Sequence, residues 1–219
     1  MNSLIIGGTS GLGLELARKF SEEGEVIVTG RHDPEVDFAE YREFDLAQEN
    51  LTESIDKLIS DAPKIDRFVY AAGYYQEGRI TDLSNEEIEA MMNVGARALV
   101  YFVKAILDKQ DGFDELITIT STSQWTPRKL EPVYNYAKAA AGHFSNSIAE
   151  DGRVKKVLVA GPAGMDTPFW EGIERDDLDT MMKPEWVAEQ IVELEKEDYK
   201  YRFARILRQP QRVEVVETR

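Results

Sequence analysis

A glycine-rich turn near the start of the chain joins an apolar segment to an amphipathic one. Ser3 to Ile6 runs into the turn Gly7 to Gly13, and Leu14 to Phe20 follows with the apolar spacing of a helix. Glycine lets the backbone approach a phosphate closely, and the free N–H groups at a helix start attract negative charge. Strand, glycine turn and helix in this order predict a dinucleotide-phosphate site, although the spacing Gly-x3-Gly-x-Gly differs from the common Gly-x-Gly-x-x-Gly fingerprint.

Strands and helices alternate along the remaining chain, which predicts an α/β fold with a doubly wound parallel sheet and helices on both faces. The expected strands are Ser3 to Ile6, Val26 to Thr29, Tyr41 to Phe44, Arg67 to Ala71, Glu115 to Thr120 and Lys155 to Ala160. The expected helices are Leu12 to Glu22, Asn50 to Ser60, Asn85 to Leu107, Val133 to Glu150 and Pro184 to Lys196.

Two regions are expected to depart from this alternation. Between Gly30 and Tyr41 the chain is too short for a full crossover helix, so a loop or a single turn is expected there. Near the C-terminus, Arg202 to Leu207 and Arg212 to Val216 are expected to form one or two strands around Gln209-Pro210.

The composition describes one acidic domain. The 219 residues include 26 Lys and Arg against 41 Asp and Glu, a net charge of −15, and no linker-like or low-complexity stretch divides them. We therefore expect a single domain over residues 1–219. The charge argues against binding to nucleic acid or to an anionic membrane surface.

The chain shows no apolar run near the roughly 20 residues of a membrane span, and no signal-peptide pattern precedes the first strand. It has no cysteine, which excludes disulfides and thiolate chemistry, and its only histidines are His32 and His143. We expect a cytoplasmic protein with no metal site, no nucleic-acid partner and no membrane partner.

A tyrosine and a lysine lie four residues apart in Tyr134-Asn135-Tyr136-Ala137-Lys138, which is predicted to be helical. Residues at i and i+4 are neighbours on a helix, so the Lys138 ammonium can favour the phenolate of Tyr134, whereas Tyr136 faces away. Acid–base work near neutrality requires the tyrosine pKa to fall from roughly 10 by about three pH units, which corresponds to about 4 kcal/mol. A solvated surface pair is the alternative for this motif alone.

The glycine spacing and the distant Tyr-x3-Lys motif together resemble the classical short-chain dehydrogenase/reductase family. The resemblance covers roughly residues 2 to 170 and implies a Rossmann-like sheet, a nicotinamide dinucleotide cofactor and hydride transfer. Further positions that agree in order are Asp45-Leu46, Ala71-Ala72-Gly73, Asn93, Ser121, and Pro162 to Thr167.

The resemblance implies which residues hold the cofactor. Gly30 lies where NAD-selective relatives carry an acidic residue, and Arg31 follows it, where a guanidinium can bind a 2′-phosphate. We therefore expect NADP to be preferred, with NAD possible; Ser10 replaces a basic residue of many NADP-preferring relatives, and a surface role is the alternative for Arg31. The expected cofactor-binding residues are Gly7, Thr9, Ser10, Gly11, Leu12, Gly13, Arg31, Asp45, Leu46, Ala71, Ala72, Gly73, Asn93, Tyr134, Lys138, Pro162 and Thr167.

Two of these sites have features of their own. Asp45 is expected to accept a hydrogen bond from the adenine amino group, and an ordinary Asp before a helix is the alternative. The turn Ala71-Ala72-Gly73 follows Tyr70, so that Tyr70 and Ala71 replace the two asparagines of the family's Asn-Asn-Ala-Gly motif. We expect this change to remove side-chain hydrogen bonds that brace the central sheet while cofactor binding survives.

The resemblance also assigns four catalytic residues. Ser121 would polarise the substrate oxygen and Tyr134 would exchange its proton. Lys138 would lower the tyrosine pKa and hold the nicotinamide ribose, and Asn93 would anchor a water in a proton relay. A neighbouring residue within Thr120 to Ser123 could take this role instead. We choose Ser121 because it precedes Tyr134 by 13 residues, the offset usual in the family that the chain resembles.

The sequence says less about substrate and assembly. A short lid over residues 170–183 is expected to offer an apolar wall, with core packing as the alternative, and the substrate is expected to be a small carbonyl or alcohol. The helices around Asn93 and Tyr134 are expected to pair in a homodimer or homotetramer. Two other functions stay open: a dinucleotide-sensing regulator without turnover, and a nucleotide-sugar epimerase.

Overall fold

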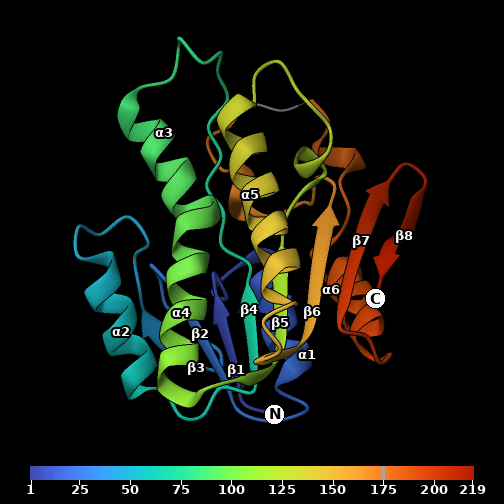
Figure 1. Cartoon of the computed structure of the whole chain (residues 1–219). Helices are drawn as coiled ribbons and strands as arrows, with labels where there is room; N and C mark the ends of the chain where they lie inside the picture. The colour runs from blue at the N-terminus through green and yellow to red at the C-terminus, as the bar shows by residue number, and fades with distance from the viewer. Residues whose placement is uncertain (174–175) are drawn as a thin grey trace.

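An eight-stranded sheet forms the centre of the molecule (Figure 1). The computed structural model describes residues 1–173 and 176–219. The strand order is β3-β2-β1-β4-β5-β6-β7-β8, and every neighbouring pair is parallel except β7 and β8. The strands are β1 (Ser3–Ile6), β2 (Val26–Gly30), β3 (Glu40–Glu43), β4 (Arg67–Tyr70), β5 (Phe113–Ile119), β6 (Val154–Pro162), β7 (Tyr201–Arg208) and β8 (Gln211–Thr218).

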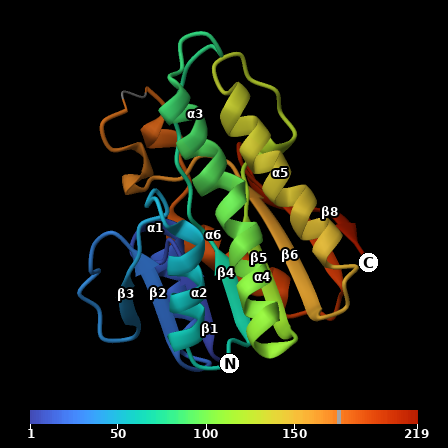
Figure 2. The same cartoon turned by 60° about the vertical axis from the view of Figure 1, so that its left-hand side comes forward.

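Helices cover both faces of the sheet, which confirms the expected doubly wound arrangement (Figure 2). The helices α1 (Gly11–Phe20) and α6 (Pro184–Glu195) pack on one face, and α2 (Leu51–Asp61), α4 (Ala98–Gln110) and α5 (Pro132–Ile148) pack on the other. Successive residues of a strand point to opposite faces, so Leu4 and Ile6 join one core while Ile5 joins the second. Apolar runs such as β1 therefore suit a sheet that is buried on both sides.

The helix before and including α4 is interrupted, contrary to the single helix expected over Asn85 to Leu107. A helix α3 (Asn85–Met92) passes into a π-helical turn, Asn93–Arg97, before α4 begins. The N–H of Ala98 donates to the carbonyl of Asn93, five residues back instead of four. Gly95 in this turn lies so close to α5 that a Cβ there would be 2.6 Å from the Cβ of Ala137. The turn therefore forms where the helix presses against α5.

The two unusual regions agree with expectation. Between β2 and β3 the chain has no helix, and β3 still pairs in parallel with β2. At the C-terminus, β7 pairs with β6 and turns back at Gln209-Pro210 into β8, which is antiparallel and forms an edge of the sheet (Figure 1). Short 3-10 turns lie at Thr122–Gln124, Pro168–Trp170 and Leu178–Thr180.

Among the described residues, the helical stretch Asn85–Gln110, which comprises α3, the π-helical turn and α4, has the length and mean hydropathy, 1.4, that a membrane span would need. Of its most apolar window, 56% is buried inside the fold, as for the core helix of a soluble protein. We therefore assign this helix to the core, where Leu99 and Phe102 are fully buried.

Candidate active site

The candidate residues gather at one edge of the sheet, because nearly all follow the carboxyl ends of parallel strands. In an open α/β sheet this edge is where ligands bind. The glycine turn follows β1, Arg31 follows β2, Asp45 and Leu46 follow β3, Ala71 to Gly73 follow β4, Ser121 follows β5, and Pro162 ends β6.

The glycine turn has the donor set that a pyrophosphate requires. Helix α1 begins at Gly11 with no side-chain cap from Ser10 and no acidic residue in its first turn, so its N–H groups face no carboxylate of their own helix. Gly7 and Gly11 have positive φ angles of 78° and 51°. A Cβ at Gly7 would lie 2.8 Å from the backbone of Ala72, so Gly7 is required by the turn after β4 as well as by its own conformation. The chain's residues thus fit a dinucleotide phosphate here.

The end of β2 is shaped by a second close approach. A Cβ at Gly30 would overlap the hydroxyl of Thr9 and would lie 2.9 Å from the Cβ of Thr9. Since the three nearest atoms all belong to Thr9, a side chain at position 30 requires Thr9 to move. Arg31, next in sequence, is exposed. β2 therefore ends without a carboxylate of its own and is followed by a guanidinium, while Glu43 of β3 lies opposite Gly30.

Other candidates of the cofactor set lie around the same edge. Asp45 is exposed, and its Oδ1 accepts a hydrogen bond from the N–H of Ala47, which holds the carboxylate in a local turn. Pro162 is buried at the end of β6, and Thr167 begins the next turn with its side chain 3.1 Å from where a Cβ of Gly11 would be. Leu12, Gly13, Leu46 and Ala72 are buried or half-buried behind these residues.

The hydroxyl of Ser121 lies beside the Tyr134 phenol, where it acts to lower the pKa of that phenol. Ser121 stands at the start of the 3-10 turn after β5, where its Oγ also accepts from the N–H of Ser123 at 3.1 Å. Tyr134 lies in the first turn of α5 and is 8% exposed. Of the hydroxyl groups in the open register, that of Ser121 contacts the phenol, while that of Ser123 donates to Glu131 at 2.8 Å.

Lys138 lies one turn along α5 from Tyr134, and the structure changes the expected relation between them. Its Nζ is 5.8 Å from the centre of the Tyr134 ring and donates to the carbonyl of Ile119 at 3.1 Å. Burial lowers the pKa of Lys138 to about 8. Burial also raises the pKa of Tyr134, and this effect outweighs the hydrogen bond from Ser121. In this conformation burial sets the direction of the Tyr134 pKa, and the expectation that Lys138 lowers it stays a prediction.

Asn93 opens the π-helical turn on the side of the site formed by α3 and α4. It is half-buried, and its Oδ1 accepts a hydrogen bond from Arg97 at 3.2 Å. The turn touches α5 through Gly95 and Ala137, the residue before Lys138. The structure therefore brings Asn93 to the same end of α5 as Lys138 and Tyr134 without a direct contact among the three.

A cluster of aromatic rings covers Tyr134, and the sequence analysis placed only part of it. The ring of Tyr75 meets Tyr134 edge-on at 5.0 Å and Trp170 at 5.4 Å. Phe169 packs 6.4 Å from Tyr134 and lies against Gly73, close to the Lys138 ammonium. Edge-on rings are a favourable packing. These rings supply the burial that raises the tyrosine pKa.

The expected lid over residues 170–183 is only partly a wall of the site; residues 174 and 175 lie outside the described part of the chain. Trp170 and Ile173 pack with the aromatic cluster. Met182 is fully buried in the core under α6, and Leu178 is 41% exposed, so neither faces Tyr134. For Met182 the alternative of core packing is correct.

A polar network beside the site was missed by sequence reasoning. The Glu131 carboxylate accepts hydrogen bonds from Ser123 at 2.8 Å, from Arg128 at 3.1 Å and from Tyr75 at 3.3 Å. Arg128 also donates to the hydroxyl of Thr122 at 2.8 Å. Such contacts join three loops, and only the i to i+3 spacing of Arg128 and Glu131 was visible in the sequence.

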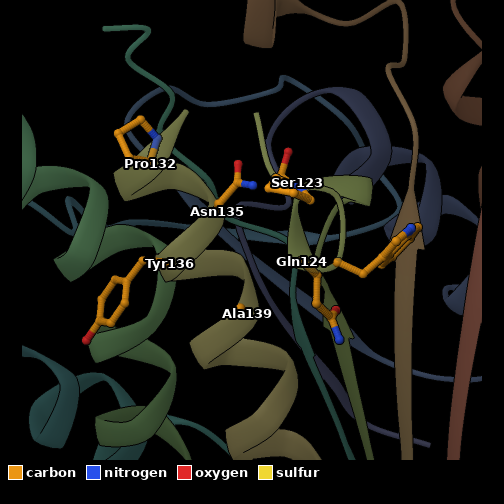
Figure 3. A pocket seen from close by; sticks show the side chains of 8 residues that line it. Ser123, Gln124, Pro132, Asn135, Tyr136 and Ala139 are labelled. Carbon is orange, nitrogen blue, oxygen red and sulfur yellow. The ribbon is translucent and has the colours of Figure 1, made fainter. Parts of the chain in front are cut away.

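A cavity of about 330 Å³ lies on the other side of this network, between α5 and the loop after β5 (Figure 3). Its wall includes Gln124, Asn135 and Tyr136, and the Tyr136 ring points away from Ser123. Tyr136 is 56% exposed, as its position two residues from Tyr134 predicts. Within residues 1–173 and 176–219, no group of three or more His, Asp or Glu side chains could hold a metal ion.

Comparison with known proteins identifies the family. The family model of short chain dehydrogenases matches residues 2–178, so the chain belongs to this family of oxidoreductases. It is 26% identical over 194 residues to an uncharacterised oxidoreductase of Staphylococcus epidermidis, covering 78% of this chain and 81% of the relative.

Solved structures agree with the fold. An alcohol dehydrogenase from Thermococcus sibiricus, complexed with 5-hydroxy-NADP, is 22% identical with a TM-score of 0.80, covering 97% of this chain and 98% of that one. The closed form of a serine dehydrogenase complexed with NADP+ is 22% identical with a TM-score of 0.76, covering 92% and 93%. At these identities the likeness shows the fold alone.

Proposed function

We propose that this protein is an NADP-preferring oxidoreductase that interconverts a small carbonyl compound and its alcohol. The observation that carries the proposal is that the Ser121 hydroxyl lies beside the Tyr134 phenol, with the buried Lys138 ammonium 5.8 Å from the centre of the Tyr134 ring. Two donors that converge on one point can hold a carbonyl oxygen, and one of them can pass its proton to it. The cofactor, when bound, supplies or accepts the hydride.

The chain's own residues account for the proton. Tyr134 is neutral near pH 7, since burial raises a pKa whose ordinary value is already about 10, and it can therefore donate to the oxygen of a carbonyl substrate. Lys138, with a pKa of about 8, is mostly protonated at that pH. Its positive charge stabilises the negative charge that remains on the Tyr134 oxygen when the proton leaves. Ser121 keeps the substrate oxygen in line with Tyr134. Asn93 is proposed to order the water through which Tyr134 regains its proton.

The catalytic assignment is tested by three variants on a panel of small carbonyl compounds with NADPH. Tyr134→Phe should lower kcat by about 10²- to 10⁴-fold and leave NADPH affinity nearly intact, because only the proton donor is lost. Lys138→Ala should reduce both turnover and NADPH affinity. Tyr136→Phe is the matched control, since its exposed ring points away from the site. An active Tyr134→Phe beside an inactive Tyr136→Phe would refute the register of the whole site.

The preference for NADP is proposed from Gly30 and Arg31. The clash with Thr9 keeps a carboxylate away from position 30, and the exposed Arg31 is in place to bind a 2′-phosphate. The two structural neighbours described above, which were solved with NADP-type cofactors, support this choice. Arg31→Ala should weaken NADPH binding by about 1.5 to 3 kcal/mol, measured by calorimetry, and change NADH little. Equal losses for both cofactors would overturn the assignment.

Self-association is proposed through the outer faces of α4 and α5. Val100 is 39% exposed and Tyr136 is 56% exposed on these neighbouring helices, and a two-fold axis would bury both. Light scattering should give a dimer or a tetramer at micromolar concentration. A monomer would count against this arrangement.

A further inference from the structure

The π-helical turn leaves one backbone carbonyl without its usual partner. In an α-helix the N–H of Ala98 would donate to the carbonyl of Val94, four residues back. Here it donates to Asn93 instead, and the Val94 carbonyl accepts a hydrogen bond from the hydroxyl of Tyr70 at 2.6 Å. A side chain at the end of β4 therefore replaces a backbone donor inside a helix. The hydrogen bond from Tyr70 thus offsets the loss of the helical hydrogen bond to Val94, because a carbonyl removed from water without a donor is destabilising.

Tyr70 is well suited to a fixed contact of this kind. It is 1% exposed, and its ring packs against Phe68 and Phe102 at 6.4 and 6.5 Å between ring centres. Burial strongly raises the pKa of its hydroxyl, which therefore remains a donor at any physiological pH. The ring is held by the core, so the oxygen has little freedom to leave Val94.

The bond connects three parts of the candidate site. Asn93 precedes Val94, and Gly95 follows it and touches Ala137 on α5, next to Lys138. Tyr70 itself leads directly into Ala71 to Gly73, where Gly73 lies close to the Lys138 ammonium. A change at the Tyr70 hydroxyl would therefore be felt by Asn93 and by the turn of α5 that carries Lys138.

We propose that Tyr70 is a positioning residue, whose hydroxyl selects the π-helical turn and thereby fixes the place of Asn93 in the turn that packs against α5. The position is one of the two at which asparagine was expected, and the structure shows a tyrosine that braces a helix there in place of an amide that braces the sheet. Without the hydroxyl, the Val94 carbonyl would compete for the N–H of Ala98, and the turn would relax toward ordinary α-helical bonding. The kinetic part of this inference rests on the proposed function, and the structural part does not.

The structural part is tested on the full chain without any substrate. Tyr70→Phe removes one oxygen and keeps the ring. We expect it to change the hydrogen-exchange rate of the Ala98 amide about tenfold, because this amide changes its carbonyl acceptor, and to shift the Asn93 side-chain amide signals in the ¹⁵N NMR spectrum. Tyr199→Phe is the matched control, because Tyr199 is also buried and its hydroxyl has no hydrogen-bond partner among the described residues. Unchanged exchange at Ala98 and unchanged Asn93 signals in Tyr70→Phe would overturn the proposal.

The kinetic part uses a double-mutant cycle with Asn93→Ala. Tyr70→Phe should lower kcat about tenfold in the wild-type background, with KM and NADPH affinity within twofold, and less than twofold when Asn93 is already alanine. A residue that only stabilised the fold would give the same loss in both backgrounds, and that result, or no loss in either, would overturn the positioning role. If the wild-type protein reduced no carbonyl of the panel, the proposed function would fail, and the exchange and NMR data would still decide the structural relation between Tyr70 and Asn93.

Discussion

Two buried cations at opposite ends of the central strands have opposite surroundings. Arg67, at the start of β4, is 2% exposed and pairs with Glu115 at 2.7 Å, Glu195 at 2.8 Å and Glu23 at 3.0 Å. Its guanidinium also lies 3.8 Å from the centre of the Phe20 ring. Lys138, beyond the other end of the strands, is 4% exposed, makes no ion pair with any described residue and donates to one backbone carbonyl.

The pKa values express the difference. Burial lowers the pKa of Arg67, but the charge and hydrogen bond of Glu115, aided by Glu195 and Glu23, outweigh burial and raise it. For Lys138 burial acts without such compensation, and its pKa falls to about 8. The ion pairs of Arg67 connect β4 to Glu115 of β5 and to Glu195 of α6. The charge of Lys138 has no such partner among the described residues, so its burial lowers the stability of the fold. Such uncompensated groups are a common mark of active sites.

The largest expected effect comes from removing the compensated cation. Arg67→Met leaves Glu115 and Glu195 buried without their partner and should lower the free energy of unfolding by about 3 to 5 kcal/mol, measured by urea denaturation. Arg18→Met is the control, because Arg18 is 54% exposed in a surface pair and its removal should cost less than about 1 kcal/mol. Similar losses of unfolding free energy in Arg67→Met and Arg18→Met would contradict the stabilising role of the buried ion pairs of Arg67.

The uncompensated cation should behave in the opposite way. A pKa lowered from 10.5 to about 8 corresponds to about 3 kcal/mol, so Lys138→Met should raise the free energy of unfolding at pH 7 by roughly 1 to 3 kcal/mol while it destroys turnover. Between pH 8 and 10.5 the unfolded chain holds a proton that the folded chain has released. The free energy of unfolding of the wild type therefore rises with pH relative to that of the variant. Urea denaturation at pH 7, 8.5 and 10 measures this. A difference that stays constant with pH would contradict the account.

The smallest effect is expected at Glu195, which shares the Arg67 cluster. Burial, then the hydrogen bond and charge of Glu115, raise the pKa of Glu195 from 4.5 to about 8. The folded chain therefore binds an extra proton between these values, and its stability contribution is complete below pH 4.5 and lost as pH rises through 8. Glu195→Gln, which imitates the protonated acid, should cost less than about 1 kcal/mol at pH 6 and should lose less stability than wild type up to pH 9. Glu193→Gln, on the exposed face, should follow the wild-type curve.

The sequence predicted the frame of this molecule well because local signals determined it. The run Ser3 to Ile6 became β1 with the expected bounds, since it ends at a glycine that the next turn requires. The helix starts expected at Asn85 and Pro184 are confirmed, and the first is capped by Ser84 in a capping box with Glu87. The missing helix between β2 and β3 followed from the short length of chain available.

What the sequence could not predict was set by contacts between distant segments. The π-helical turn at Asn93 depends on the hydroxyl of Tyr70, which belongs to another strand. The raised pKa of Tyr134 depends on burial by Tyr75 and Phe169, which reach it from two separate loops. The spacing of Tyr134 and Lys138 correctly indicated that they are neighbours, yet burial of the phenol outweighed that proximity.

The close approach of Thr9 to the end of β2 has a consequence for how this chain could evolve or be engineered. The simplest route to an NAD-selective site would place an acidic residue at Gly30, but any side chain there meets the Cβ of Thr9. The two positions are therefore coupled, because a side chain at position 30 requires Thr9 to move. A library that varies positions 9 and 30 together should yield more folded proteins than one that varies position 30 alone.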